Sequence, residues 1–227
     1  GVSKLDAVLS QTKQHHPVYV ALVNGPEGPG QTADEKFKLA AEIVRQAKEN
    51  HGVTPDQLLI DVNAYPIGSE SLEGLNFCAE TLKCLPLIKA IHPDLKTSVG
   101  VGNLTNGLAS KPYMRKVLTS VFLDEARKAG LDCAILNPHH YVPLESLTES
   151  DVKLARKVIL DRDMTAFEEL EVIAQTKKTG VQIKKIDYDD LALEESICQR
   201  IKDGFKQKEE GIINKEGGEF AYKDKIV

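Results

Sequence analysis

The chain has 227 residues, of which 41% are hydrophobic and 28% charged, and its formal net charge is −5. This composition is ordinary for a globular protein and excludes disorder along the whole chain. The acidic balance gives no electrostatic footprint for nucleic acid or for an anionic membrane. No apolar run reaches the roughly 18 residues that cross a bilayer, and the first residues lack the features of a secretory signal. We therefore expect a cytoplasmic protein without nucleic-acid or membrane partners.

The four cysteines are Cys78, Cys84, Cys133 and Cys198, and none of them belongs to a CxxC pair. Their spacing is not that of a disulfide framework, so we expect reduced thiols. Burial as small hydrophobic side chains is the simplest interpretation, and no metal site is predicted.

Four hydrophobic stretches each end in an asparagine, and we predict them as strands over residues 18–24, 58–63, 98–103 and 133–137. The four asparagines follow one another at intervals of 39, 40 and 34 residues. A long amphipathic segment separates each pair, so the pattern indicates a repeated β-then-α unit and a parallel sheet. In parallel α/β folds the carboxyl ends of the strands carry the chemistry, which makes this edge the candidate functional surface.

Helices are predicted before and between these strands. Ser3, followed by Asp6, is the expected cap of a first helix that buries Leu5, Val8 and Leu9. A capping box of Thr32 and Glu35 opens the second helix, in which Phe37, Ala40, Ala41, Val44 and Ala47 recur until Gly52. In the third, Pro86 is expected to kink or split the helix. The fourth begins near Met114 and closes at Lys128 with Gly130 as its cap.

No further strand is predicted after Asn137. Thr148 with Asp151 opens one helix, and Thr165 with Glu168 opens another. We expect residues 1–180 to form the main domain, and residues 181–227 to form a helical extension and a flexible tail. In the extension the apolar positions Leu193, Ile197, Ile201 and Phe205 recur at every fourth residue, which is typical of a docking face.

The strand count limits the architecture. A closed (β/α)8 barrel, the TIM barrel, needs eight strands and about 250 residues, whereas this chain offers four strands. An open four-stranded parallel sheet leaves two bare edges, which proteins cover or pair. The expectation is an α/β half-barrel whose other half is supplied by further sequence, by another polypeptide or by a second copy in a homodimer.

Three runs of the sequence carry a family resemblance: LLIDVNAYP (58–66), SVGVGNLTNGLASKPYMRKVLTSVFLDEARKAGLDCAILNP (98–138) and VILDRDMTAFEELEVIAQTKKTG (158–180). They resemble the methyltetrahydrofolate-binding domain of corrinoid-dependent methyltransferases, a group within the pterin-binding (β/α)8 superfamily that also contains dihydropteroate synthase. The resemblance covers most of residues 15–180. It implies that the four strands are the fifth to eighth of a TIM barrel, the C-terminal half.

The resemblance also implies roles for residues at the strand ends. Asp61 corresponds to the carboxylate that accepts hydrogen bonds from the pyrimidine ring of the pterin, a task suited to an acceptor with two oxygens. Asn103 corresponds to the asparagine near N5 of the folate, where a proton or positive character is needed as the methyl group departs. The alternatives are a buried Asp61 bonded to backbone amides and an Asn103 that caps the following turn.

Further substrate contacts are assigned more loosely, to Asn63, Asn24, Asn106, Lys111 and Asn137. For Asn24 and Asn137, capping or bracing a loop is an equal alternative. His139 and His140 are interpreted as loop histidines, because adjacent side chains point in different directions and no acids lie near them in sequence.

The function implied by the resemblance is transfer of the N5-methyl group of methyltetrahydrofolate to Co(I) of a corrinoid (cobalamin) that a partner protein or domain carries. A dihydropteroate synthase-like enzyme is the alternative within the superfamily, although GNLTNGLASK and DVNAYPIGSE depart from its signatures. A second alternative is a catalytically silent assembly module derived from such a barrel, which forms a dimer through its open edges.

Overall fold

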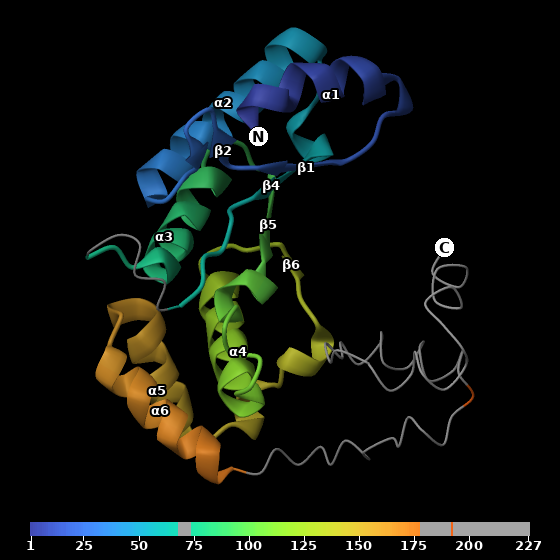
Figure 1. Ribbon diagram of the computed structural model, residues 1–227. Helices are drawn as coiled ribbons and strands as arrows, with labels where there is room; N and C mark the ends of the chain where they lie inside the picture. Colours follow the sequence, from blue (N-terminus) through green and yellow to red (C-terminus); the bar gives the residue numbers. More distant parts are fainter. Residues whose placement is uncertain (68–73, 178–191, 193–227) are drawn as a thin grey trace, which may run out of the picture. The chain divides into compact units, whose positions relative to one another are not determined.

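Four short parallel strands form the main sheet of the computed structural model, which describes residues 1–67, 74–177 and 192. The strands are β1 (Tyr19–Leu22), β4 (Leu58–Asp61), β5 (Lys96–Gly100) and β6 (Cys133–Ile135). They lie side by side in chain order, β1-β4-β5-β6 (Figure 1). A separate two-stranded antiparallel ribbon pairs β2 (Asn24–Gly25) with β3 (Gly28–Pro29). All four predicted strands are therefore present, and each ends before its asparagine.

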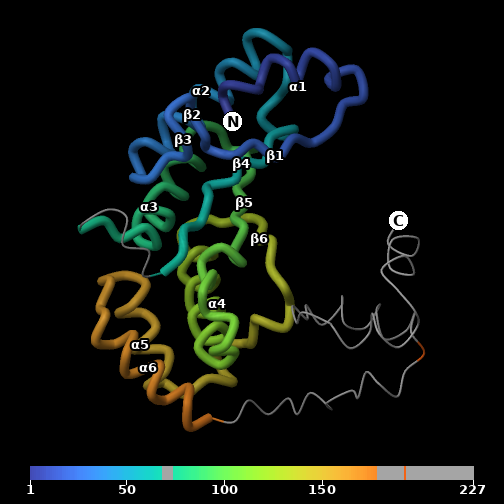
Figure 2. The backbone as a smooth tube through the Cα atoms, in the orientation of Figure 1, coloured from blue at the N-terminus to red at the C-terminus, as the bar shows by residue number. Residues whose placement is uncertain are grey.

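Helices connect the strands and continue beyond the last one. The α-helices are α1 (Leu5–Thr12), α2 (Ala33–His51), α3 (Phe77–Lys89), α4 (Pro112–Lys128), α5 (Glu149–Arg156) and α6 (Met164–Thr176). Short 3-10 helices are η1 (Val2–Lys4), η2 (Lys13–His15), η3 (Pro55–Gln57), η4 (Val101–Thr105), η5 (Pro138–His140) and η6 (Leu144–Ser146), and a π-helical turn, η7, covers Lys157–Asp161. The backbone trace follows this alternation of strand and helix (Figure 2).

The crossover helices pack against one another in the order of the strands. Helix α1 contacts α2, α2 contacts α3, α3 contacts α4, and α4 contacts both α5 and α6. Neighbouring parallel strands joined by helical crossovers of one hand place those helices on one face of the sheet. The buried core lies between this helical layer and the strands, and it includes Ile60 and Val99, both with no exposed surface.

The opposite face of the sheet is covered at its centre, where Ser98 is buried, but is left open at β1 and at the end of β6 by the described residues. Pairing of the strands places Leu22, Asp61, Ser98 and Cys133 in one row and Val20, Leu59 and Lys96 in the next. Val20 is 51% exposed and Leu22 39%, and Ile135 at the end of β6 is 62% exposed. The observed fold is an α/β fold with a partial parallel sheet, so the α/β class is confirmed and a closed TIM barrel is not.

Several local predictions are confirmed. The backbone N–H of Glu35 donates to Thr32 Oγ1 at 3.2 Å and Glu35 Oε2 accepts from the Thr32 N–H at 3.1 Å, which completes the capping box of α2. Gly52 ends the helix with a φ of 67°, in the left-handed region that glycine adopts without strain. Thr148 caps α5 by accepting from the Asp151 N–H, as predicted.

Other local predictions are wrong. Ser3 lies inside η1 and does not cap α1, because a 3-10 turn runs directly into that helix, and Val8 is 46% exposed. Of the kink or split expected at Pro86, the split is absent, because α3 continues without a break from Phe77 to Lys89 although the proline removes one N–H donor. Asp163, and not Thr165, caps α6, because its carboxylate accepts from the Ala166 N–H. Cys133 is exposed on the partly open face, while Cys78 and Cys84 are buried.

The extension predicted for residues 181–227, with its apolar stripe and Cys198, lies outside the described residues apart from Ala192. Among the helices of the described part, none is long and apolar enough to span a membrane.

Candidate functional site

A connected set of polar groups lies at the carboxyl end of the sheet, where β1, β4 and β5 terminate. Asp61 is the last residue of β4 and is 8% exposed. Its register partners are Leu22 on β1 and Ser98 on β5, so its side chain belongs to the row on the partly open face. Ser98 Oγ donates to Asp61 Oδ2 at 3.4 Å, the long end of the range for such a bond. The carboxylate is thus placed at the edge where ligands of parallel α/β folds bind.

Asn63 connects this carboxylate to the end of β1. Its backbone N–H donates to Asp61 Oδ1 at 2.9 Å, and its side-chain Nδ2 donates to Asn24 Oδ1 at 2.7 Å. Asn63 has a φ of 54°, in the left-handed region that asparagine visits more readily than most residues. The structure therefore brings together three of the predicted site residues, Asn24, Asp61 and Asn63.

Asp61 keeps hydrogen-bonding capacity for a ligand. An ionised carboxylate has about four lone-pair sites on its two oxygens. One Oδ1 site is used by the Asn63 amide and one Oδ2 site by the Ser98 hydroxyl. The remaining sites are suited to a pair of adjacent N–H donors, and the amide and hydroxyl hold the carboxylate in a fixed orientation.

Asn103 lies one strand further along the same edge, in the 3-10 helix η4 that follows β5. It is exposed, and its Nδ2 lies 3.6 Å from the position that a Cβ atom on Gly100 would take. The amide therefore folds back over the last residue of β5. The Asn106 N–H donates to the Asn103 carbonyl oxygen at 3.2 Å, and Asn106 is also exposed. Both residues are exposed in the segment that directly follows β5.

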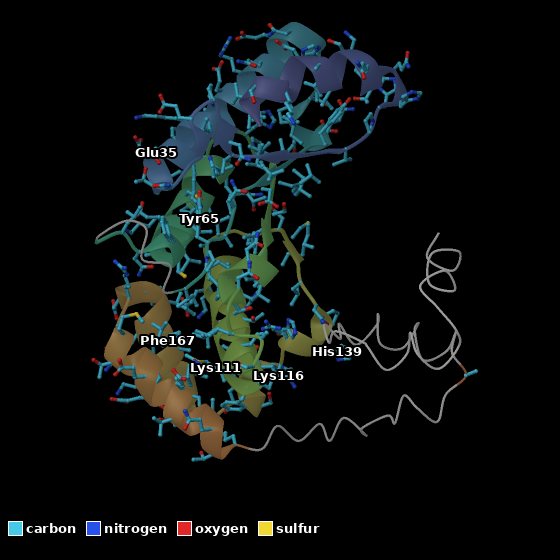
Figure 3. The ribbon with its side chains drawn as sticks, in the orientation of Figure 1. Glu35, Tyr65, Lys111, Lys116, His139 and Phe167 are labelled. Carbon is cyan, nitrogen blue, oxygen red and sulfur yellow. The ribbon has the colours of Figure 1, made fainter. Side chains whose placement is uncertain are left out.

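The other two predicted contacts are engaged elsewhere. Lys111 precedes α4, and its Nζ forms an ion pair with Glu171 Oε1 of α6 at 2.6 Å, away from the strand ends (Figure 3). Asn137 caps η5, because its Oδ1 accepts from the His139 N–H at 3.0 Å. The structure does not bring either side chain to the set formed by Asn24, Asp61 and Asn63.

A buried lysine beneath the end of β4 was missed from the sequence. Lys36 of α2 has no exposed surface, and its Nζ donates to Val62 O at 2.6 Å, to Asn63 O at 2.8 Å and to Thr81 Oγ1 at 2.9 Å. The ammonium also lies 5.2 Å from the centroid of the Tyr65 ring, a cation–π distance. These contacts fix the backbone directly after Asp61.

The environment of Lys36 disfavours its charge. Burial lowers its pKa from 10.5 to about 8, against smaller opposing effects that include the nearby Asp61. The signal for burial was present in the sequence, because Lys36 lies four residues before Ala40 and so on the apolar face of the helix.

This arrangement, a parallel sheet with convergent amide and carboxylate groups at its carboxyl edge, is the one at which α/β folds bind small molecules. No protein-family model matches the chain. Individual proteins, however, are similar to it in sequence. The chain is 30% identical over 208 residues to the methionine synthase of Mycobacterium tuberculosis (strain ATCC 25618 / H37Rv), and the match covers 89% of the chain and 17% of that protein. It is 27% identical over 207 residues to the methionine synthase of Mycobacterium leprae (strain TN), and this match also covers 89% of the chain and 17% of the relative.

A third relative is the methylcorrinoid:tetrahydrofolate methyltransferase of Eubacterium limosum, 26% identical over 167 residues, which are 73% of the chain and 58% of that protein. Together these relatives support a pterin-binding domain of corrinoid-dependent methyltransferases, and the resemblance found in the sequence is confirmed. The chain spans only a part of each relative.

Proposed function

We propose that this chain forms the C-terminal half of a pterin-binding barrel that binds methyltetrahydrofolate and transfers its N5-methyl group to Co(I) of a corrinoid protein. The observation that carries the proposal is that Asp61 ends β4 while Asn103 lies in the turn directly after the neighbouring strand β5. The similarity to methionine synthases and to a methylcorrinoid:tetrahydrofolate methyltransferase supports the same class of reaction.

Asp61 would hold the pyrimidine ring of the substrate. That ring offers adjacent N–H donors, and the free lone pairs of the carboxylate accept two of them side by side. Because Asn63 and Ser98 already fix the carboxylate, little conformational entropy is lost when the ring binds. Lys36 acts indirectly in this scheme, by holding the carbonyl groups of Val62 and Asn63.

Asn103 would serve the reacting end of the substrate. When the N5–methyl bond breaks, the methyl group passes to the nucleophile that the corrinoid supplies, and N5 keeps the bonding electron pair and takes a proton. An exposed amide next to N5 supports this change, since its N–H donates to the lone pair and its C=O accepts from the protonated nitrogen. Asn106 lies in the same exposed loop and is a secondary contact.

The partly open face requires a partner. Exposed Val20, Leu22 and Ile135 lie where a closed barrel would have its interior, and β1 and β6 end the described sheet. We propose that a second set of parallel strands, from further sequence or from another polypeptide, pairs with these edges and completes the pocket. A homodimer would satisfy the same edges, and it is the arrangement that an assembly module without catalysis would use.

Calorimetric titration with methyltetrahydrofolate tests the proposal. It is made with the chain alone and with the chain mixed with the part of the Eubacterium limosum relative that the chain does not match. We expect weak binding alone and tighter binding in the mixture, with methyl transfer to a corrinoid protein reduced in Asn103→Ala. Asn50→Ala is the matched control, because Asn50 is exposed at the end of α2, outside the strand-end loops.

Two outcomes would count against the proposal. The first is a complemented barrel that does not bind methyltetrahydrofolate, and the second is transfer by Asn103→Ala equal to that of Asn50→Ala. Light scattering at micromolar concentration separates the assembly alternative, since a stable dimer that binds no pterin would leave assembly as the function.

A further inference from the structure

Four basic side chains gather where α4 meets η5, and we refer to them as the cationic cluster: Arg115 and Lys116 of α4, and His139 and His140 of η5. The two elements contact each other, and Lys116 and His139 are labelled on them in Figure 3. Arg115 Nη1 lies 3.1 Å from His140 Nε2. Since the guanidinium only donates, His140 accepts through Nε2 and is neutral in this contact.

No anion within the described residues compensates the cationic cluster. Among residues 1–67 and 74–177, no carboxylate forms an ion pair with any of its four members. Other cations nearby are neutralised: Lys111 by Glu171, Arg156 by Glu125 and Lys177 by Asp151. In addition, Arg115 Nε is buried and has no hydrogen-bond partner in the described part of the chain. An unpaired buried donor among unbalanced positive charges is suited to an anionic ligand.

The electrostatics of His140 agree with this view. Burial lowers its pKa, and the positive charges of Arg115, His139 and Lys116 lower it further. An anion bound among these groups would act in the opposite direction and raise the pKa, so the imidazole is a reporter for occupancy.

The position of the cluster relative to the candidate site suggests which anion it takes. Asp61 ends β4, Asn103 follows β5, and the histidines follow β6, so the three lie in strand order along one edge. Neighbouring strands are ~4.8 Å apart. A reduced folate has the same order of parts: the pyrimidine ring, then N5, and then the substituent that carries p-aminobenzoate and glutamate.

We propose that the cationic cluster binds the carboxylates of the glutamyl tail of the folate substrate, and so favours folates with several glutamates. This inference rests on the proposed function, which sets the orientation of the ring. The guanidinium of Arg115 suits a carboxylate because it donates two parallel N–H groups, and Lys116 adds a charge that a second carboxylate can use.

A tail fragment without a pterin tests the inference directly. The probe is p-aminobenzoyl-tri-γ-glutamate, titrated into the full chain while the imidazole C2–H resonances of His139 and His140 are followed by NMR. We expect both resonances to shift and the pKa of His140 to rise. The double variant Arg115→Met/Lys116→Met should bind the fragment at least tenfold more weakly. Lys48→Met, at an exposed position on α2, is the control for a lost positive charge.

The remaining outcomes decide between the two proposals. Equal fragment binding by the double variant and by Lys48→Met overturns the tail site, as does an equal response to inorganic phosphate at matched ionic strength. Because Arg115 is half-buried, Lys116→Met alone is measured as well, and it should lose at least threefold. In the complemented barrel, the affinities of methyltetrahydrofolate with three glutamates and with one glutamate are also compared. Equal affinities would overturn the tail site and leave the proposed function standing. A methyltetrahydropterin that lacks the p-aminobenzoyl-glutamate tail is tested with the same complemented barrel. If it does not bind, the proposed function is overturned.

Discussion

The side chain of Asn63 donates to the side chain of Asn24 at 2.7 Å, across 39 residues of sequence. This bond joins the loops that follow β1 and β4, two strands that are neighbours in the sheet. Asn63 also holds Asp61 through its backbone N–H, so one residue links the end of β1 to the carboxylate. Its left-handed backbone, with a φ of 54°, makes both contacts possible at once.

Substitution of Asn63 separates the effect of the backbone from that of the side chain. In Asn63→Ala the left-handed conformation costs about 1 kcal/mol, and the lost side-chain bond costs about another 1 kcal/mol. Asn63→Gly removes the same bond but relaxes the backbone, so it should retain more stability. We expect the free energy of unfolding, measured with urea, to be highest for the wild type, lower for Asn63→Gly and lowest for Asn63→Ala.

An Asn63→Gly variant that is less stable than Asn63→Ala would contradict this view of the backbone. Asn24→Ala removes the acceptor of the same bond without touching the left-handed residue. It should cost about 1 kcal/mol.

Much of the fold was predictable from patterns within single segments. The alternating strands and helices were correct because apolar periodicity is a local signal, and the Thr32 and Thr148 caps were correct because a cap and its N–H partner lie three residues apart. The failures are also physical. Asp163 and Thr165 are both acceptable caps, and the structure uses Asp163, which follows the π-helical turn and its left-handed cap Arg162.

The residues of the site at the ends of the strands were predictable from the sequence. The side chains that come from the helices, and the contacts they make, were not. Asp61, Asn63 and Asn24 meet because parallel strands bring their carboxyl ends together. Lys111 is drawn to Glu171 of α6, a contact between segments 60 residues apart that no local pattern contains. Lys36 was overlooked because a lysine on an apolar face is rare, and its acceptors are mostly backbone carbonyls.

Replacing Asp61 tests the proposed ring contact. Asp61→Asn keeps the size of the side chain but replaces one acceptor oxygen by an NH₂ donor that opposes the ring N–H groups. A hydrogen bond to a charged group contributes roughly 1.5–3 kcal/mol, so binding of methyltetrahydrofolate should weaken about ten- to a hundredfold. Calorimetry of the complemented barrel measures this change.

Ser98→Ala is the companion variant for Asp61. It removes the hydroxyl contact at 3.4 Å and leaves the carboxylate in place, so its effect on binding should be smaller. If Asp61→Asn bound the pterin as tightly as Ser98→Ala, the carboxylate would not be a ring contact.

The capping box of α2 gives a test of local stability. Thr32→Ala removes the acceptor for the Glu35 N–H and should lower the free energy of unfolding by about 1 kcal/mol. Glu35→Gln should be nearly neutral, because glutamine serves equally at the third position of a capping box. Urea denaturation of both variants measures the difference. If Glu35→Gln lost more free energy of unfolding than Thr32→Ala, the charge of Glu35, and not its hydrogen bonds, would stabilise the helix.

Lys36 makes the stability of the protein depend on pH in an unusual direction. Its pKa is about 8 in the folded chain, against 10.5 as the ordinary value, because burial disfavours the charge. Between these two values the unfolded chain binds more protons than the folded one, so the free energy of unfolding rises with pH. The cost of burying the ammonium is present in full below pH 8 and is relieved as the pH increases towards 10.5.

Lys36→Met isolates this contribution. Between pH 7 and 9 the wild type should gain about 1 kcal/mol of stability from Lys36, whereas the variant gains nothing from this position. Groups such as His140 titrate equally in both proteins, so they cancel in the difference between the two urea-denaturation curves. Two curves that stay parallel over this range would show that Lys36 keeps an ordinary pKa. Its three hydrogen bonds would then stabilise the charge as well as water does, and the lysine would hold the end of β4 at every pH near neutrality.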